Sequence, residues 1–405
     1  MFFDLTNQSV RELMTEAEFG IERESLRVNA DGTLAQSEHP FGARRHIDRD
    51  FCENQVEIIG DVFNTPEDLN RQLHAIQNEI GETLAAKGEL LWPFSNPPKI
   101  SGEDEIPVAR FVGSQQGKSA YRHYLAAKYG KKKMLFSGIH LNFSFTEPLL
   151  QTAFSQSGQT GYAAFKNGIY LSLAKRFTQY AWLVVFLTAA SPVTDASLGI
   201  ESNVYASPRC SVQGYWNDFI PILDYKDLNS YVDSVERYVE SGRLKSASEL
   251  YYPVRVKPRG ANSLDALRLG GINHLELRVL DVNPLSRTGI FTEDIRFIHL
   301  LLLYLSNLPE FDFDAQEQER AVRSVQAAAV FGNEQARQAA AAELEKLSSF
   351  AECCFPAFAD AVRYQQNKLK KGGSYAEIIS AQYTGGYMNK GLALARVYQR
   401  GVTYV

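Results

Sequence analysis

The segment 20–29, with the sequence GIERESLRVN, carries two carboxylates at a spacing that suits metal chemistry. Side chains of an extended chain alternate between two faces, so one face of this segment carries Glu22, Glu24, Leu26 and Val28. Arg23 and Arg27 lie on the other face. Paired acids favour a hard cation, because Mg²⁺ and Mn²⁺ take carboxylate oxygens and leave positions open for phosphate. A chain with 47 acids contains some Glu-x-Glu pairs by chance, so this segment alone does not define a site.

Three further segments offer polar groups in the same way. Residues 138–145, GIHLNFSF, alternate between an apolar face and one that carries Gly138, His140, Asn142 and Ser144. Residues 272–280, INHLELRVL, place His274, Glu276 and Arg278 together. In RDFCENQVEII, residues 49–59, Glu57 shares a face with Glu53 and Gln55, whereas Asp50 has the opposite parity. Asp50 must therefore lie before the strand or across a bulge if it is to join Glu57.

Together these segments supply an oxygen-rich set of candidate metal ligands with one imidazole. The set is Glu22, Glu24, Asp50, Glu57, His140 and Glu276. It suits two or three Mg²⁺ or Mn²⁺ ions better than zinc, which prefers Cys and His. With Arg278 adjacent, such ions indicate chemistry on a nucleoside triphosphate, where cations offset the charge of a transferred phosphoryl group.

Many spaced segments resemble the glutamate–cysteine ligase family of bacterial type, including the ligase half of bifunctional glutathione synthases. They are residues 20–34, 49–59, 121–130, 137–145, 207–217 and 249–284, with a fainter similarity at 374–398. The resemblance implies an enzyme that makes γ-glutamylcysteine from ATP, L-glutamate and L-cysteine. It also implies an α+β fold in which helices surround a funnel-like antiparallel sheet, similar to glutamine synthetase and guanidine kinases.

The resemblance also implies roles for individual residues. The six candidate ligands match the family's magnesium ligands, and Arg278 matches the arginine that contacts the transferred phosphoryl group, so Arg278, Glu22 and Glu276 are expected to be catalytic. Positions lining the substrate and cysteine pocket are matched by Phe51, Tyr121, Arg122, Leu125, Tyr215 and Tyr251, and further substrate positions by Arg209 and Asn142. The chain is shorter than the enterobacterial enzymes after residue 290 and ends before a second ligase domain. We therefore expect it not to make glutathione by itself.

Composition limits the remaining classes of function. The chain has 405 residues, 45% of them hydrophobic, and a net charge of −5, which argues against general nucleic-acid binding. The apolar run 180–193 is too short to span a bilayer and predicts a buried helix. No signal peptide is visible, and the four cysteines do not form a disulfide framework. We therefore expect a cytoplasmic protein with no membrane partner.

The order of the predicted elements indicates one catalytic domain over residues 1–405. We expect a sheet core over about 15–290 and a helical part over about 291–405. Capping and periodicity predict a helix from Thr65 to about Gly88, another over 160–190, and an alanine-rich helical hairpin over 315–370. We expect Mg²⁺ as the metal, with Mn²⁺ as a substitute, ATP as cosubstrate, and a monomer; an oligomer stays an open alternative.

Other interpretations stay open at this level. A related carboxylate–amine ligase could use a different acceptor amine. A phosphotransferase of the guanidine-kinase type would share the metal ligands and arginines but release a phosphorylated product. A catalytically inactive scaffold is disfavoured, because all the candidate ligands are present. The glycine-rich segment 113–119 has three residues between its glycines instead of four and is not expected to bind phosphate.

Overall fold

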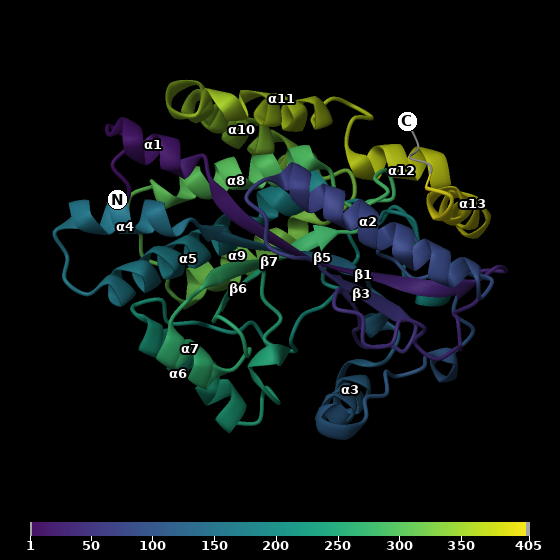
Figure 1. The fold of residues 1–405 in the computed structure, drawn as a ribbon. Coiled ribbons are helices and arrows are strands. Elements are labelled where there is room, and N and C mark those ends of the chain that lie inside the picture. Colours follow the sequence, from purple (N-terminus) through teal and green to yellow (C-terminus); the bar gives the residue numbers. More distant parts are fainter. Residues whose placement is uncertain (1, 402–405) are drawn as a thin grey trace.

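The computed structural model describes residues 2–401, which fold around a seven-stranded sheet. The strands lie in the order β2 (Ile47–Arg49), β3 (Gln55–Ile59), β1 (Ala17–Asn29), β5 (Gly138–Phe145), β7 (His274–Asp281) and β6 (Val254–Lys257), and β4 (Glu89–Leu91) pairs with the far end of β1. Every neighbouring pair is antiparallel. The α+β prediction with an antiparallel sheet surrounded by helices is confirmed (Figure 1).

The apolar face of the central strands is covered by three long helices, α2 (Pro66–Ala85), α5 (Tyr162–Thr188) and α8 (Thr292–Ser306). Phe19 of β1 and Phe143 of β5 pack against His299 of α8, with ring centroids 5.5 and 5.6 Å apart. The other face turns toward α3 (Gln116–Tyr129), α6 (Leu228–Glu240) and α7 (Leu264–Gly270), which lie below the sheet in Figure 1. The alternation seen in the sequence therefore separates a packed face from a polar one.

The helices predicted from capping are present. Thr65 accepts a hydrogen bond from the Asp68 amide, Pro66 begins α2, and Gly88 adopts a positive φ of 70° three residues after the helix ends. Helix α5 covers the predicted 160–190 region and ends at Thr188, ahead of Pro192. Two short helices, α1 (Gln8–Met14) and α4 (Glu147–Ser157), flank this layer.

The helical region predicted over 315–370 is confirmed, but its expected arrangement as a hairpin is wrong. The region forms α9 (Ala315–Ala328), α10 (Glu334–Cys354) and α11 (Ala359–Lys368), of which α10 and α11 pack together while α9 packs on α5. The chain turns at Gly332, which has a φ of 67°, and Asn333 then caps α10. The alanine-rich composition hid this break, because alanine suits any helix interior.

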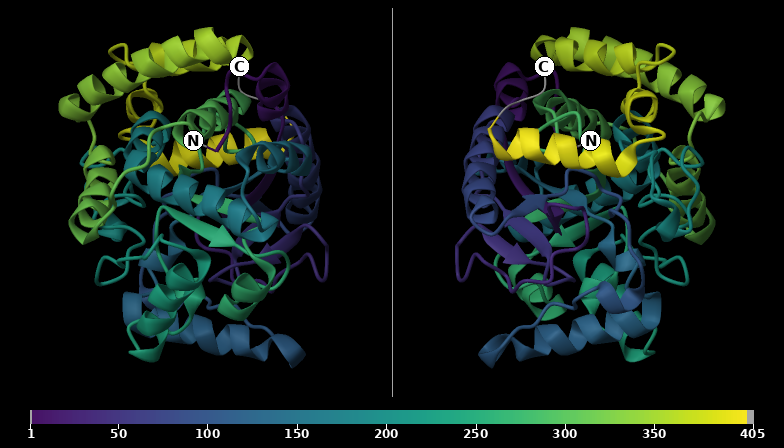
Figure 2. Two further views of the ribbon diagram at one scale, coloured as in Figure 1. Left: turned by 90° about the vertical axis from the view of Figure 1, so that its left-hand side faces the viewer. Right: turned by 90° about the vertical axis from the view of Figure 1, so that its right-hand side faces the viewer.

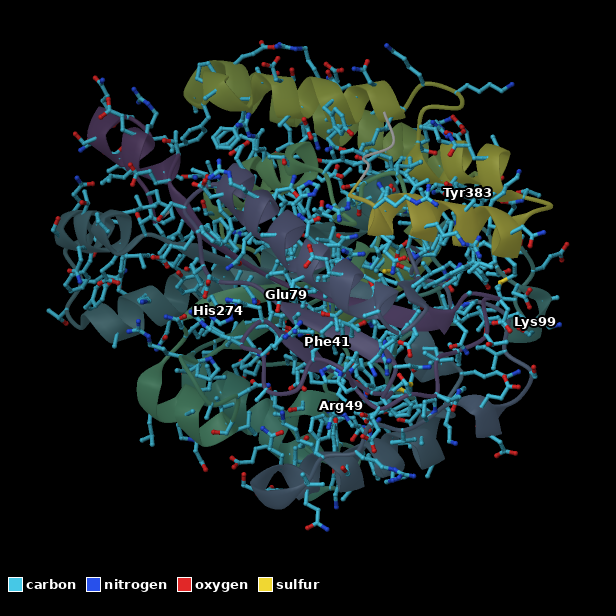
Figure 3. All side chains as sticks on the ribbon, turned by 45° about the vertical axis from the view of Figure 1, so that its right-hand side comes forward. Phe41, Arg49, Glu79, Lys99, His274 and Tyr383 are labelled. Carbon is cyan, nitrogen blue, oxygen red and sulfur yellow. The ribbon has the colours of Figure 1, made fainter. Side chains whose placement is uncertain are left out.

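The last helices, α12 (Tyr375–Tyr383) and α13 (Tyr387–Gln399), bring the end of the described chain back to its start. The right-hand view of Figure 2 shows α13 beside α2. Gln399 Nε2 donates to the carbonyls of Gly81 and Glu89, at 3.3 and 2.8 Å. Tyr383, labelled in Figure 3, packs edge-on against Phe94 with centroids 5.0 Å apart. No helix within residues 2–401 is long and apolar enough to cross a membrane, and the four cysteines are free thiols.

A buried ion pair joins α11 and α12 to α8. Lys368 Nζ lies 2.6 Å from Asp294 Oδ1 and donates to the Leu187 carbonyl, and the Tyr375 hydroxyl donates to Asp294 Oδ2 at 2.8 Å. Both charged side chains are at most 5% exposed. Removing one partner would leave the other charge buried and uncompensated.

We expect Lys368→Met to lower the free energy of unfolding by about 3–5 kcal/mol, because Asp294 would lose its counter-charge. Lys346→Met is the matched control: its pair with Glu343 is also short, 2.8 Å, but Lys346 is 56% exposed, so the loss should stay below about 1 kcal/mol. Urea unfolding of the three proteins measures both values. Equal losses in the two variants would contradict the importance assigned to the buried pair.

Candidate active site

The antiparallel register of the central strands brings the candidate ligands together. Glu22 of β1 lies opposite His140 of β5, and Asn142 of β5 lies opposite Glu276 of β7. His140 Nδ1 is 3.1 Å from Glu22 Oε2 and 3.6 Å from Glu276 Oε1. One ligand atom from each of Glu22, His140 and Glu276 lies within 4.8 Å of the other two. Three segments far apart in sequence therefore form one cluster.

A β-bulge in β7 places Arg278 beside this cluster. Ile139 pairs with Leu280 and Leu141 with Leu277, so β7 holds one extra residue opposite His140. Arg278 Nη1 donates to Glu276 Oε1 at 2.9 Å. Bulges redirect side chains and recur next to active sites. Here the bulge lets both Arg278 and its neighbour Val279 face the cavity.

A second group of acids lies on the same face of the sheet, where β1 pairs with β3. Glu24 is directly opposite Glu57 in the pairing of β1 with β3. Asp50 lies before β3, in the connection from β2, which answers the question of parity raised by the sequence. Burial, followed by the charge of Asp50, raises the pKa of Glu24 to about 8. Burial and the charges of Asp50, Glu22 and Glu24 raise the pKa of Glu57 well above its usual value.

The first cluster has the opposite electrostatic balance. Burial acts to raise the pKa of Glu276, but the charges of Arg278, Lys257 and Arg255 outweigh it and hold the pKa well below its ordinary value. Burial and the Arg278 charge lower the pKa of His140, which favours the neutral imidazole. A neutral imidazole and an ionised carboxylate are the forms that bind metals.

The donors in this region fit Mg²⁺ or Mn²⁺. Glu276 Oε1 faces His140 and Arg278, whereas its Oε2 is buried, makes no hydrogen bond and lies 3.5 Å from Lys257 Nζ. Burial first, and then repulsion between neighbouring acids, raises the pKa values of Glu24 and Glu57, and a bound cation would favour their ionised forms. Oxygen donors with a single nitrogen match these hard ions and not zinc.

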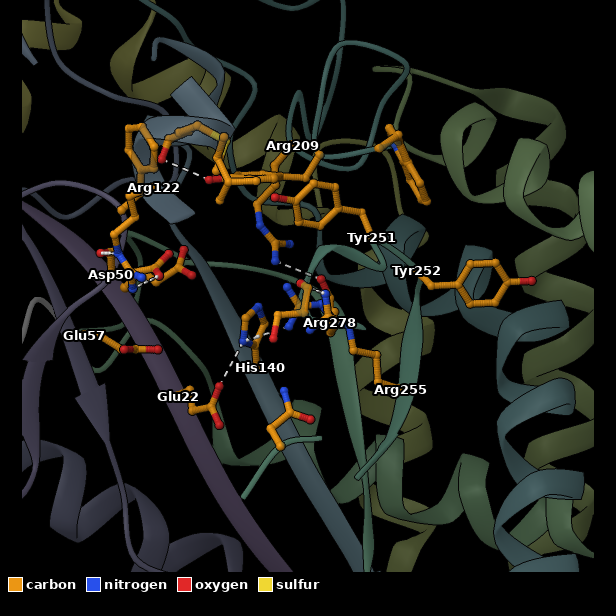
Figure 4. Close-up of a pocket in the computed structure, with 18 of the residues that line it drawn as sticks. Glu22, Asp50, Glu57, Arg122, His140, Arg209, Tyr251, Tyr252, Arg255 and Arg278 are labelled. Atoms are coloured by element: carbon orange, nitrogen blue, oxygen red, sulfur yellow. Dashed lines mark hydrogen bonds and ion pairs between the residues drawn. The ribbon is translucent and has the colours of Figure 1, made fainter. Parts of the chain in front are cut away.

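Most of the predicted residues line one cavity of about 530 Å³ (Figure 4). They are Glu22, Glu24, Asp50, Phe51, Glu57, Tyr121, Arg122, Leu125, His140, Arg209, Tyr215, Tyr251 and Arg278. Two predicted residues do not border it: Glu276 lies beneath His140 and Arg278, and Asn142 Nδ2 lies 3.4 Å from Glu22 Oε1. Both contact residues of the cavity wall.

Aromatic and apolar side chains form the part of the cavity that faces α3. Tyr215 and Tyr251 pack edge-on with centroids 5.5 Å apart, and Phe51 and Leu125 are buried beside them. Arg122 Nε donates to the Asp50 carbonyl at 2.5 Å. This wall combines an apolar slot with a guanidinium near its rim.

Arg209 is held over β5 by the absence of a side chain at Gly138. A Cβ on Gly138 would lie 2.3 Å from the Arg209 guanidinium carbon. Arg209 Nη2 donates to the Arg278 carbonyl at 2.8 Å, and the Gly138 amide donates to Glu24 Oε2 at 2.9 Å. Glu24 is therefore bonded to the backbone of β5, and Arg209 is bonded to the backbone of β7 at Arg278.

Sequence reasoning missed the cationic strand that supports Glu276. Arg255 also lines the cavity and lies 4.0 Å from Glu276 Oε2, and Lys257 lies 3.5 Å from the same oxygen. The alternation in VRVK, residues 254–257, places both on one face and was the available signal. The prediction for segment 113–119 stays untested; Gly117 and Lys118 border the cavity.

The raised pKa of Glu24 predicts how stability depends on pH. The folded form holds its proton up to about pH 8, against an ordinary value of 4.5, so its stabilising contribution is lost as pH rises through 8. We expect the melting temperature of chelator-treated protein to fall between about pH 5.5 and pH 8.5, and the fall to be smaller in Glu24→Gln. Scanning fluorimetry measures this, and an unchanged slope in the variant would refute the assignment.

Comparison with known proteins places this site in context. The family model for glutamate-cysteine ligase matches residues 3–241 and 211–327. The chain is 36% identical over 319 residues to the glutathione biosynthesis bifunctional protein GshAB of Listeria welshimeri, covering 73% of this chain and 41% of that protein. It is 31% identical over 376 residues to the glutamate–cysteine ligase of Clostridium acetobutylicum, covering 79% of this chain and 78% of that one.

Solved structures agree with these matches. The bifunctional glutathione synthetase of Pasteurella multocida superposes with a TM-score of 0.86 at 30% identity, covering 96% of this chain and 53% of that one. The glutamate–cysteine ligase of Francisella tularensis, solved with AMP, has a TM-score of 0.84 at 24% identity, covers 96% of this chain and 89% of that one, and shows the fold. The chain spans about two fifths of the bifunctional relatives, at 41% of their length. By its matched length and its identity to these relatives, this chain belongs to the glutamate–cysteine ligase family.

Proposed function

We propose that this chain joins the γ-carboxylate of L-glutamate to the amine of L-cysteine, using ATP and passing through γ-glutamyl phosphate. The products are γ-glutamylcysteine, ADP and phosphate. The observation that carries the proposal is the single cavity in which Arg278, two groups of acids and an aromatic wall meet. Family membership supports the same activity.

Mg²⁺ is proposed at the acids of this cavity, with Mn²⁺ as a substitute. Glu22, His140 and Glu276 would hold one ion, and Glu24, Asp50 and Glu57 would supply ligands for others. Bound Mg²⁺ would supply charge compensation for ATP phosphates and for the transferred phosphoryl group. Because Glu24 carries a proton below about pH 8, binding there would release protons.

The side chains themselves account for positioning. A carboxylate does not react with an amine at neutral pH, so the γ-carboxylate must first receive a phosphoryl group. Arg278 is charged and fixed by Glu276, so its free guanidinium nitrogens can bond to phosphoryl oxygens without reorganising. Arg209, held over Gly138, is suited to a substrate carboxylate. ATP and glutamate are both anions and repel each other. These residues would lower the barrier by holding the two substrates in position.

The aromatic wall is proposed as the acceptor site. Phe51, Leu125, Tyr215 and Tyr251 offer an apolar slot for a short side chain, and Arg122 lies close enough to the rim to pair with the acceptor carboxylate. The acceptor amine would attack the acyl phosphate and expel phosphate through a tetrahedral intermediate. No enzyme nucleophile is needed.

We extend the proposal to organisation and location. The two large hydrophobic clusters share β1 and α13 returns to β4, which supports one catalytic unit over the described residues. Free thiols at all four cysteines support a reducing, cytoplasmic compartment. The proposed partners are the small-molecule substrates, with the chain acting as a monomer.

The test of function is ADP release with each substrate combination. We expect rapid ADP formation, matched by γ-glutamylcysteine, only when ATP, Mg²⁺, glutamate and cysteine are all present. 2-Aminobutyrate should replace cysteine with a kcat/KM within roughly 10- to 200-fold, because an apolar slot senses a thiol mainly by size. A stable phosphorylated amino acid as product would favour a phosphotransferase, and faster turnover of a charged amine would refute the acceptor.

Arg278→Lys should lower kcat by about 100-fold and change the KM for glutamate less, because a point charge does not replace a planar fork on two phosphoryl oxygens. Arg27→Lys is the matched control: Arg27 is also buried in an ion pair, with Glu89 at 2.6 Å, but it does not line the cavity, so this change should affect stability more than kcat. Steady-state kinetics and melting temperatures separate the two. A kcat unchanged in Arg278→Lys would mean that Arg278 only pairs with Glu276.

A further inference from the structure

Glu249 is a buried acid outside the cavity that the proposed chemistry does not use. It ends the short 3₁₀ helix η5 (Ala247–Glu249), two residues before Tyr251, and its side chain is 0% exposed. Its neighbours Ser248 and Tyr251 border the cavity, whereas Glu249 does not. Glutamate is almost never fully buried unless it is paired, so the partners of Glu249 indicate its role.

Three of these partners belong to the C-terminal half of α3. Glu249 Oε1 lies 2.7 Å from Lys128 Nζ and accepts a hydrogen bond from the Tyr129 hydroxyl at 2.7 Å. The Tyr124 hydroxyl donates to the same oxygen at 3.4 Å. Burial acts to lower the pKa of Lys128, but its hydrogen bonds to Glu249 and Tyr124 outweigh burial and raise the pKa, so the lysine stays charged. One carboxylate oxygen therefore holds three side chains of α3.

The rest of Glu249 is bonded to the segments that carry the aromatic wall. Its Oε2 accepts from the Lys245 amide at 2.6 Å, and its carbonyl accepts from Asn217 Nδ2 at 2.8 Å. Asn217 Oδ1 accepts from the Tyr251 amide at 3.0 Å, and Asn217 Nδ2 also donates to the Tyr129 hydroxyl at 3.1 Å. The rings of Tyr129 and Tyr251 pack edge-on with centroids 5.5 Å apart. Glu249 therefore lies where α3 meets the segment that carries Tyr251.

Helix α3 supplies one part of the proposed acceptor site and lies at the lower edge of the molecule, below the sheet (Figure 1). Its residues Tyr121, Arg122 and Leu125 border the cavity. The N-terminal half of the helix is attached through Arg122, whose Nε donates to the Asp50 carbonyl at 2.5 Å. The C-terminal half is attached through Glu249, and Leu125 lies between the two attachments.

We propose that Glu249 is a positioning residue, which fixes the C-terminal half of α3 against Tyr251 and thereby sets the width of the acceptor site. The inference rests on the ligase function proposed above. Cysteine has a short side chain, and a gap of about 0.5–1 Å already removes roughly a quarter to a half of the dispersion attraction between two surfaces. A loosened α3 would therefore weaken the binding of cysteine. Glutamate and ATP would keep their proposed contacts, because Arg278 lies on β7 and Arg209 is held over β5.

The kinetic test compares Glu249→Gln with a matched control, Asp294→Asn. Glutamine has one acceptor oxygen where Glu249 uses two, so either the α3 donors or the Lys245 amide lose their bond. Asp294 is buried with the same types of partner, Lys368 at 2.6 Å and the Tyr375 hydroxyl at 2.8 Å, but it lies on α8 and does not border the cavity.

We expect the KM for cysteine to rise on the order of 10- to 100-fold in Glu249→Gln, and the KM values for glutamate and ATP to change by less than about threefold. Asp294→Asn should melt earlier than wild type but keep all three KM values. A similar rise in all three KM values in Glu249→Gln, or the same selective rise in the control, would overturn the proposal.

A second readout does not depend on activity. Amide hydrogen exchange of the full chain should be faster over α3 in Glu249→Gln than in wild type, and unchanged there in Asp294→Asn. If Glu249→Gln fails to fold, Tyr129→Phe removes one bond to Glu249 Oε1, keeps the ring, and should give the same two changes with smaller size. Unchanged exchange over α3 in the folded variant would refute the attachment. If the wild-type protein makes no γ-glutamylcysteine, the proposed function fails, whereas exchange still decides whether Glu249 fixes α3.

Discussion

The burial of several acids against one another, along one face of β1 and its neighbouring strands, is the constraint on which the candidate site depends. Glu24 lies opposite Glu57, and the pKa values of both are raised, while Glu276 stays ionised only because three cations surround it. Backbone pairing enforces this arrangement, since the strands cannot separate without losing their hydrogen bonds. Burying these acids therefore costs free energy in the folded state, and the proposed divalent cation would offset that cost. The buried acids lower the stability of the fold, and the packing of helices on the apolar face of the sheet offsets this loss.

The remainder of the active-site architecture answers this constraint. Arg278 enters through a bulge, Arg209 through the missing side chain of Gly138, and Arg255 through alternation on the edge strand β6. Each device brings a guanidinium to an acid without disturbing the packed face of the sheet. Cations and anions are therefore interleaved among the residues that line the cavity.

Sequence alone reached most of this picture for a definite reason. Alternation along a strand predicts which residues share a face, and ligand chemistry then groups Glu22, His140 and Glu276, which lie together in the structure. Three features lay beyond that logic. Strand β2 has three residues, too few to show a period. The bulge in β7 exists only in its pairing with β5, and the contact of Glu276 with both His140 and Arg278 follows from that register. The alanine-rich composition of residues 315–370 predicts helix throughout, because alanine carries no information on where a helix ends.

Strand β1 alternates acids that face the cavity with arginines that face the covered side of the sheet. A one-residue slip in its pairing with β3 or β5 would invert both sets at once. It would place Glu22 and Glu24 in the hydrophobic core beneath α2. It would also turn Arg23 and Arg27 toward the cavity. In most amphipathic strands the apolar residues alone fix the register. In β1 the charged residues on both faces fix it as well. Single-residue insertions or deletions within residues 20–27 should therefore be far less tolerated than in the loops that flank β1.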